Sequence, residues 1–159
     1  MRRAELGITS GSRMEDILRS CIVCRLGLCC NGQPYVVPLC YGYEDGSLYI
    51  HCAPEGRKLE AIRANDRVCF EVEEIAELER TGDGACDWDM RYRSLIGFGR
   101  ATILTSREDR LHAAKVLLGH LASARGVTVD PGDMDVSGML AIRVEVDSMT
   151  GRQSERQSS

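Results

Sequence analysis

The segment from His51 to Lys58 combines residue types that can bind an anion. A strand pattern ends at His51, a loop containing Pro54 and Gly56 follows, and a helix pattern begins with Arg57 and Lys58. A helix N-terminus offers free N–H groups and the positive end of the dipole, so two cations in its first turn oppose that dipole. A phosphate bound by both cations would remove the conflict, whereas a solvated basic turn is the alternative.

His51 is a candidate for proton transfer, because an imidazole changes charge near neutral pH. A single histidine at the end of an apolar strand is, however, more often a packed or hydrogen-bonded structural residue. Tyr49 lies two residues earlier and is expected on the same face of the strand. His112 and His120 fall in a helix pattern, and we interpret both as surface residues.

The eight cysteines are the most unusual feature of the composition. Cys21 and Cys24 have CxxC spacing, and Cys29 and Cys30 follow nearby, but a zinc site would need four thiolates that converge. Strand positions one or three apart point to opposite faces, so these side chains should diverge. We therefore expect reduced, packed thiols and no metal site.

Length and charge limit the class of protein. The chain has 159 residues, with 20 Lys and Arg against 24 Asp and Glu, and this mildly acidic balance does not suggest a nucleic-acid surface. We expect one domain over residues 1–147 and a polar tail over 148–159. No secretory signal or membrane-length apolar run is present, so we expect a cytoplasmic protein. Dinucleotide-binding, P-loop, GxSxG and HExxH motifs are also absent.

The elements that must position these residues are mainly strands. Six segments have strand patterns, at about 22–30, 35–43, 47–52, 68–72, 92–104 and 139–146. Asn31–Gly32 and Asp45–Gly46 are typical of tight turns, so the first three strands should be antiparallel. Gly97 and Gly99 indicate a bulge or a close backbone approach, as in a sheet that curls. We predict a mainly β fold with helices (α+β), a six-stranded, mostly antiparallel barrel.

Three helices are predicted between these strands. The first begins at a capping box, Ser12 to Glu15, the second covers 57–64, and the third is capped by Ser106. Apolar residues of the third helix share one face and are expected to be buried: Leu111, Ala114, Leu118 and Leu121.

Several of these segments together resemble a known family. They are Val23–Leu26, Val37–Leu39 followed by Tyr41–Tyr43, His51–Lys58, Asn65–Glu71, and Cys86–Trp88 leading to Tyr92–Ala101. In this order they look like the 5-nitroimidazole-resistance (Nim-type) branch of the pyridoxamine 5′-phosphate oxidase-like flavoproteins. The resemblance implies an FMN-binding split β-barrel and a homodimer with the flavin at its interface.

The resemblance also implies a set of cofactor contacts. Arg57 and Lys58 would hold the FMN phosphate, with Ile50, His51 and Cys52 on the adjoining strand end. The flavin ring would lie along Val37, Pro38 and Leu39. Ser94 would supply a further polar contact, although it is shorter than the Gln common in the oxidases.

The function implied is an FMN-dependent oxidoreductase that reduces nitro-aromatic, 5-nitroimidazole-like, or other small electrophilic acceptors, with His51 as proton donor. The alternative is a flavin- or haem-binding carrier or sensor without turnover, in which His51 could be an axial haem ligand. A barrel that has lost its cofactor site is the third interpretation.

Overall fold

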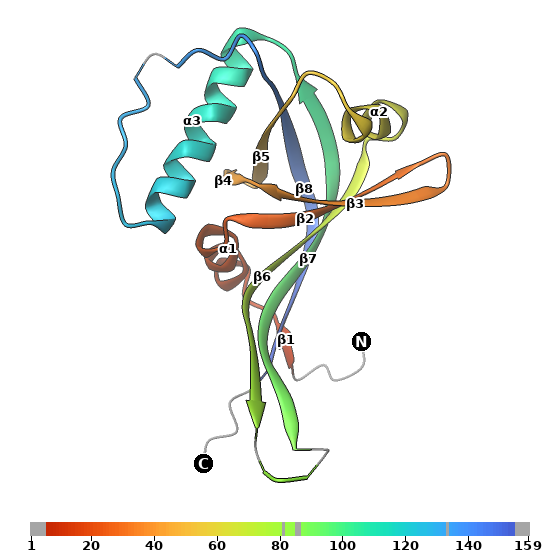
Figure 1. Cartoon of the computed structure of the whole chain (residues 1–159), viewed down its shortest axis with the longest axis vertical. Coiled ribbons are helices and arrows are strands. Elements are labelled where there is room, and N and C mark those ends of the chain that lie inside the picture. The colour runs from red at the N-terminus through yellow and green to blue at the C-terminus, as the bar shows by residue number, and fades with distance from the viewer. Residues whose placement is uncertain (1–5, 81, 85–86, 133, 155–159) are drawn as a thin grey trace.

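The computed structural model describes residues 6–80, 82–84, 87–132 and 134–154, and its elements alternate long strands with three helices (Figure 1). In chain order they are β1 (Gly7–Ile8), α1 (Gly11–Ser20), β2 (Val23–Cys30), β3 (Gln33–Cys40), β4 (Gly42–Glu44), β5 (Ser47–Cys52), α2 (Arg57–Ala64), β6 (Arg67–Arg80), β7 (Trp88–Leu104), α3 (Arg107–Ala124) and β8 (Leu140–Gln153). None of the described helices is long and apolar enough to cross a membrane.

One antiparallel sheet organises the molecule, in the order β3-β2-β6-β7-β8-β5-β4, with β1 added to β8. The predicted mainly antiparallel fold with helices is therefore confirmed. The predicted number of six strands is too low, because the structure has eight. The short strands β1 and β4 account for the difference. β1 has only two residues, too few to show a strand pattern, and β4 was included in the predicted strand 35–43.

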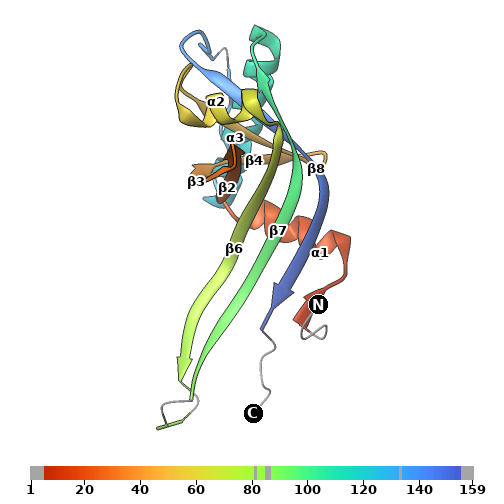
Figure 2. The ribbon, with the colours of Figure 1, turned by 90° about the vertical axis from the view of Figure 1, so that its right-hand side faces the viewer.

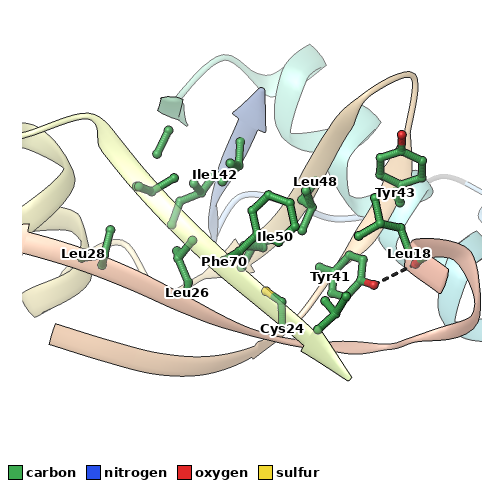
Figure 3. Packing of buried hydrophobic residues seen from close by; sticks show 14 of the residues in the cluster. Leu18, Cys24, Leu26, Leu28, Tyr41, Tyr43, Leu48, Ile50, Phe70 and Ile142 are labelled. Carbon is green, nitrogen blue, oxygen red and sulfur yellow. Dashed lines mark hydrogen bonds between the residues drawn. The ribbon is translucent and has the colours of Figure 1, made fainter. Parts of the chain in front are cut away.

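Tyr41 divides the predicted strand 35–43 into β3 and β4. Its backbone N–H donates to the carbonyl of Ile22 at 3.2 Å, and its buried hydroxyl donates to the carbonyl of Leu18 at 2.7 Å (Figure 3). Before Tyr41 the chain pairs with β2, and after it the chain pairs with β5. Apolar residues continue through this point, so the strand pattern alone does not show the change of partner.

Strands β6 and β7 form a hairpin that extends well past the barrel (Figures 1 and 2). Their pairing runs from Arg67 opposite Arg100 to Arg80 opposite Trp88, whereas the sequence predicted that β6 would end near Val72. Polar residues alternate through this extension, which has little core to cover and therefore little apolar pattern.

The tail predicted to begin at Ser148 is wrong in its boundary. Strand β8 continues to Gln153, and Ser148 to Gln153 pair with β7. Backbone pairing to a long neighbour stabilises this segment, although its side chains are mostly polar. Residues 155–159 of the predicted tail lie outside the described residues.

The glycines of β7 confirm the predicted close approach. A Cβ at Gly97 would overlap the Phe70 ring, and one at Gly99 would overlap the carbonyl oxygen of Glu145. The pairing with β8 also shifts register between Phe98 and Gly99. These positions let a buried aromatic ring and a neighbouring strand lie directly against β7.

The ends of the helices agree only partly with the sequence. Ser106 caps α3 by accepting from the N–H of Asp109, as predicted. The cap of α1, however, is Ser10, which accepts from the N–H of Arg13, and Ser12 lies inside the helix. The predicted capping box is therefore wrong, because a second serine two residues earlier takes its place.

The buried face of α3 also differs from the predicted one. Its buried residues are Ala113, Ala114, Leu117 and Ala122, of which only Ala114 was predicted. A Cβ at Gly42 of β4 would lie 2.7 Å from the Leu117 backbone, so small residues bring the helix directly onto the strand. This close crossing decides the rotation of α3.

His120 is not the surface residue that the sequence suggested. Its Nδ1 accepts from the N–H of Tyr43 at 3.2 Å, and its Nε2 lies 2.7 Å from the carbonyl oxygen of Cys21. The acceptor role of Nδ1 leaves the proton on Nε2, which donates to that carbonyl. The ring thus ties α3 to β4 and to the end of α1.

The seven described cysteines are free thiols, and three of them are core residues: Cys21, Cys24 and Cys52. Cys21 ends α1, and Cys24 on β2 is fully buried beside the aromatic core of the barrel (Figure 3). Burial raises the pKa of Cys21 to about 11 and that of Cys24 to about 12. Cys86 lies outside the described residues.

These thiols should make the fold less stable in alkali. An unfolded thiol ionises near pH 9.0, whereas the folded Cys21 and Cys24 keep their protons to about 11 and 12. The folded state therefore binds more protons above pH 9.0, and the free energy of unfolding should fall by up to about 1.4 kcal/mol per pH unit for each thiol. Tyr41, whose pKa burial also raises, adds to the same trend.

Urea unfolding across this pH range tests the expectation. Cys24→Ala should reduce the pH slope, and Cys29→Ala, at a half-buried thiol that does not act on the pKa of Cys21 or Cys24, should leave it unchanged. Equal slopes in both variants would contradict the assignment.

Candidate functional site

The two edges of the sheet face one another across a split. β3 is one edge strand, and β4 covers only residues 47–49 of β5, so residues 50–52 of β5 have no strand partner on that side. β3 and β5 lie close to each other without pairing. The split is therefore lined by backbone groups that neither edge satisfies, which is where a ligand can bind.

The β3 side of the split carries Val37, Pro38 and Leu39. Val37 and Leu39 are half-buried and pack against the core, and Pro38 between them is exposed. Because proline has no N–H to donate, it suits an edge strand, as the sequence indicated. This side therefore presents an apolar strand edge.

The β5 side contains Ile50, His51 and Cys52. Ile50 and Cys52 are buried in the barrel, whereas His51 is exposed and points to the opposite face. Tyr49 lies on the same face as His51, as expected, and its ring meets the ring of His112 edge-on. His51 is beyond this contact and open to a ligand.

The start of α2 has no side-chain cap. Its N-cap is Gly56, with a φ of 130° that favours glycine, and no side chain accepts from the first N–H groups. The carbonyl of Gly56 accepts from the N–H groups of Leu59 and Glu60. The exposed N–H groups and the dipole of the first turn therefore remain available to an anion.

Arg57 and Lys58 connect this helix start to the two sides of the split. The guanidinium of Arg57 lies 4.6 Å from the centre of the Tyr35 ring on β3. Lys58 is half-buried and lies near Cys52 of β5. Burial raises the pKa of the Cys52 thiol, and the positive charge of Lys58 partly opposes this rise. Within the described part of the chain neither cation has a carboxylate within 4.0 Å.

The structure brings together eight of the nine predicted contacts: Val37, Pro38, Leu39, Ile50, His51, Cys52, Arg57 and Lys58. Ser94 is the exception. It lies on β7, opposite Glu73 of β6 and Arg152 of β8. The part of β7 that lies near α2 is marked by Arg100, whose guanidinium donates to the Asp66 carboxylate just after that helix. Ser94 is six residues away from Arg100 along the strand. At about 3.3 Å per residue, this separation removes Ser94 from the same chain's helix start.

A second feature adjoins the split and was missed by sequence analysis. It is a mainly apolar groove of about 320 Å³ on the outer face of β2, β3, β6 and β7. Its lining includes Gly27, Tyr35, Val36, Cys69 and Phe98. Tyr35 also contacts Arg57, so the groove begins where the basic helix start ends. The sequence feature that could have predicted this groove is the presence of apolar residues on both faces of β3 and β7.

Comparisons with known proteins place this geometry in context. Residues 10–153 match the family model described as pyridoxamine 5′-phosphate oxidase. A crystal structure of a candidate 5-nitroimidazole antibiotic resistance protein from Bacteroides thetaiotaomicron is 30% identical, with a TM-score of 0.76 over 91% of this chain and 84% of that chain. The predicted split-barrel fold is thereby confirmed.

Two further relatives are of similar length. A FAD-binding protein from Mesorhizobium loti is 31% identical, with a TM-score of 0.67, 92% of this chain covered and 96% of that one. An uncharacterized protein of Rhizobium meliloti is 26% identical over 152 residues, 91% of this chain and 93% of the relative.

Proposed function

The chain belongs to the pyridoxamine 5′-phosphate oxidase family, and from this premise we propose that it is a flavoprotein that binds FMN at the split. The observation that carries the proposal is the start of α2. Two adjacent cations stand at an uncapped helix N-terminus and have no carboxylate partner within the described chain. A phosphate satisfies the helix and both cations at once.

FMN suits this site better than FAD does. The phosphate of FMN is terminal and carries up to two negative charges, so Arg57 and Lys58 can each meet an oxygen. In FAD the corresponding phosphate carries one charge and continues into a second nucleotide. A relative that is 31% identical is a FAD-binding protein, so the choice of flavin needs a direct test.

The remaining split residues would hold the flavin ring. Val37 and Leu39 offer apolar side chains, and Pro38 keeps the strand edge without a competing N–H group. Ile50 and Cys52 of β5 are buried, and their side chains face the interior of the barrel. Together these groups exclude water from one side of a planar ligand.

The proposed activity is reduction of nitro-aromatic or other small electrophilic acceptors, which the resemblance to the 5-nitroimidazole-resistance branch implies. A bound flavin supplies hydride or electron transfer in such a reaction. The contribution of the chain is orientation by the split and a proton from His51, which is exposed on the β5 side.

We further propose that a second copy of the chain covers the outer face of β7. Trp88, Met90, Ile96 and Phe98 share one face of this strand and are 46 to 53% exposed. This stripe is continuous with the apolar groove through Phe98. Ser94 lies on the same face, so it would serve the flavin of the second copy and not that of its own chain.

Flavin titration tests the phosphate assignment. The double variant Arg57→Gln/Lys58→Gln should bind FMN at least about a hundredfold more weakly, because two charge-assisted contacts are lost. Its affinity for riboflavin, which has no phosphate, should not change. Arg63→Gln, at an exposed position in the last turn of the same helix, is the matched control. FMN affinity equal to that of the wild type would contradict the site, and tighter FAD binding would contradict the choice of flavin.

The role of His51 can be separated from binding. His51→Asn should retain FMN but reduce the rate of nitroimidazole reduction about a hundredfold, measured anaerobically with a chemical reductant. His112→Asn, a histidine bound to Glu44 at the far end of β4, is the control. A wild-type protein that binds flavin without turnover would instead support the carrier or sensor, and unchanged turnover in His51→Asn would remove its proton role.

The second-copy proposal predicts a change of mass in solution. Phe98→Asp should convert a dimer to a monomer in light scattering and lower flavin occupancy, because a charge would be buried in an apolar interface. Val127→Asp is a matched control, since Val127 is 54% exposed and Phe98 is 53% exposed. A dimer that persists in Phe98→Asp with an intact circular dichroism spectrum would place the interface elsewhere.

A further inference from the structure

Residues of α1, β4 and α3 line a polar cleft. These three elements lie away from α2 in the ribbon (Figure 1). The volume of the cleft is about 390 Å³, and its walls come from all three elements. They include Arg19 of α1, Tyr43 and Glu44 of β4, and Lys115 and Gly119 of α3. None of the proposed flavin contacts lines this helical cleft.

The charges of the cleft are unbalanced. Lys115 forms no ion pair within the described chain, and Arg19 reaches only Glu15, at 3.9 Å on an exposed helix face. The carboxylate of the cleft, Glu44, is bound to His112 at 3.0 Å. Two cations on facing helices and one carboxylate therefore line the cleft, and the exposed pair of Arg19 with Glu15 contributes little to neutralise this positive excess.

Two groups hold the shape of the cleft. Arg19 is positioned over the ring of Tyr43, 5.1 Å from its centre. His120 uses both ring nitrogens on backbone partners of β4 and α1, so it fastens the walls together and is not itself a free ligand group. The cations therefore flank a cavity whose walls are tied together.

Gly119 is the one glycine of the cleft lining. It lies inside α3, where glycine weakens a helix relative to alanine. A Cβ at this position would meet nothing within 4 Å, so no packing within the chain requires glycine. The residue leaves the cleft open one helical turn after Lys115.

We propose that the helical cleft, which Arg19, Lys115 and Gly119 line, binds a small oxyanion, the phosphate or carboxylate of a small molecule. Both cations can donate charge-assisted hydrogen bonds to such a group. The partly apolar lining, which includes Val116, would accept an organic substituent. This site is independent of the flavin site and does not rest on it.

Phosphate titration monitored by amide NMR, at constant ionic strength with chloride, tests the proposal. Inorganic phosphate should shift the signals of Gly119 and its neighbours in the wild type and in Arg57→Gln/Lys58→Gln. Lys115→Gln and Arg19→Gln should each weaken this binding about tenfold. Arg125→Gln, just beyond α3, should have no effect and controls for general surface charge.

A steric variant completes the test. Gly119→Leu should abolish the phosphate response without loss of stability, because leucine favours helix and its Cβ meets no neighbour. Phenyl phosphate distinguishes the two sources of the oxyanion, since tighter binding than inorganic phosphate identifies an organic ligand and equal binding identifies the free ion. Three results would overturn the proposal. The first is the absence of a phosphate response at Gly119, and the second is a response that persists unchanged in Lys115→Gln. The third is a response that disappears in Arg57→Gln/Lys58→Gln.

Discussion

The change of strand partner at Tyr41 is the constraint on which the rest of the structure depends. The buried phenol donates to the carbonyl of Leu18, and the backbone N–H of the same residue donates to Ile22, so Tyr41 is fixed at the point where β3 ends. β4 then continues on β5, at the other end of the sheet. Because the two ends are joined by only one residue, they must lie near each other, yet they cannot pair. The split exists for this reason, and the apolar β3 edge and the exposed end of β5 become neighbours.

The helix that follows β5 begins next to this gap, because Arg57 in its first turn contacts the Tyr35 ring of β3. Gly56 permits the sharp entry at positive φ, and Leu59 and Ile62 bury the opposite face of α2. With that face held by the core, Arg57 and Lys58 have to remain on the split side, where one reaches the Tyr35 ring and the other approaches the Cys52 thiol. Two cations in a first turn are unfavourable in an isolated helix. Their position here follows from tertiary packing, and an anion is the group that makes it favourable.

Local chemistry predicted much of this arrangement from the sequence alone. The residues of the two predicted turns, Asn31–Gly32 and Asp45–Gly46, all have positive φ, as their turn type requires. The start of α2 likewise depends on residues that are neighbours in the sequence. The close approach at Gly97 depends on the absence of a side chain at that one position. The failures have a common physical cause. The break at Tyr41, the extension of β8 to Gln153 and the buried bonds of His120 depend on partners distant in the chain. The family resemblance grouped Ser94 with Arg57, whereas β7 carries it along the strand to another part of the sheet.

The distribution of charge links the two proposed sites. The chain has 24 Asp and Glu against 20 Lys and Arg, but on β2, β6 and β7 carboxylates pair with arginines, as in Arg25–Glu71, Arg91–Glu77 and Arg93–Glu74. Pairing of this kind leaves little field on the strands. Lys58 at the split and Lys115 in the helical cleft have no such partner within the described residues, so each leaves an unneutralised positive charge at its cavity despite the acidic total. Net charge is therefore no guide to where an anion binds, because binding depends on local groups of charges.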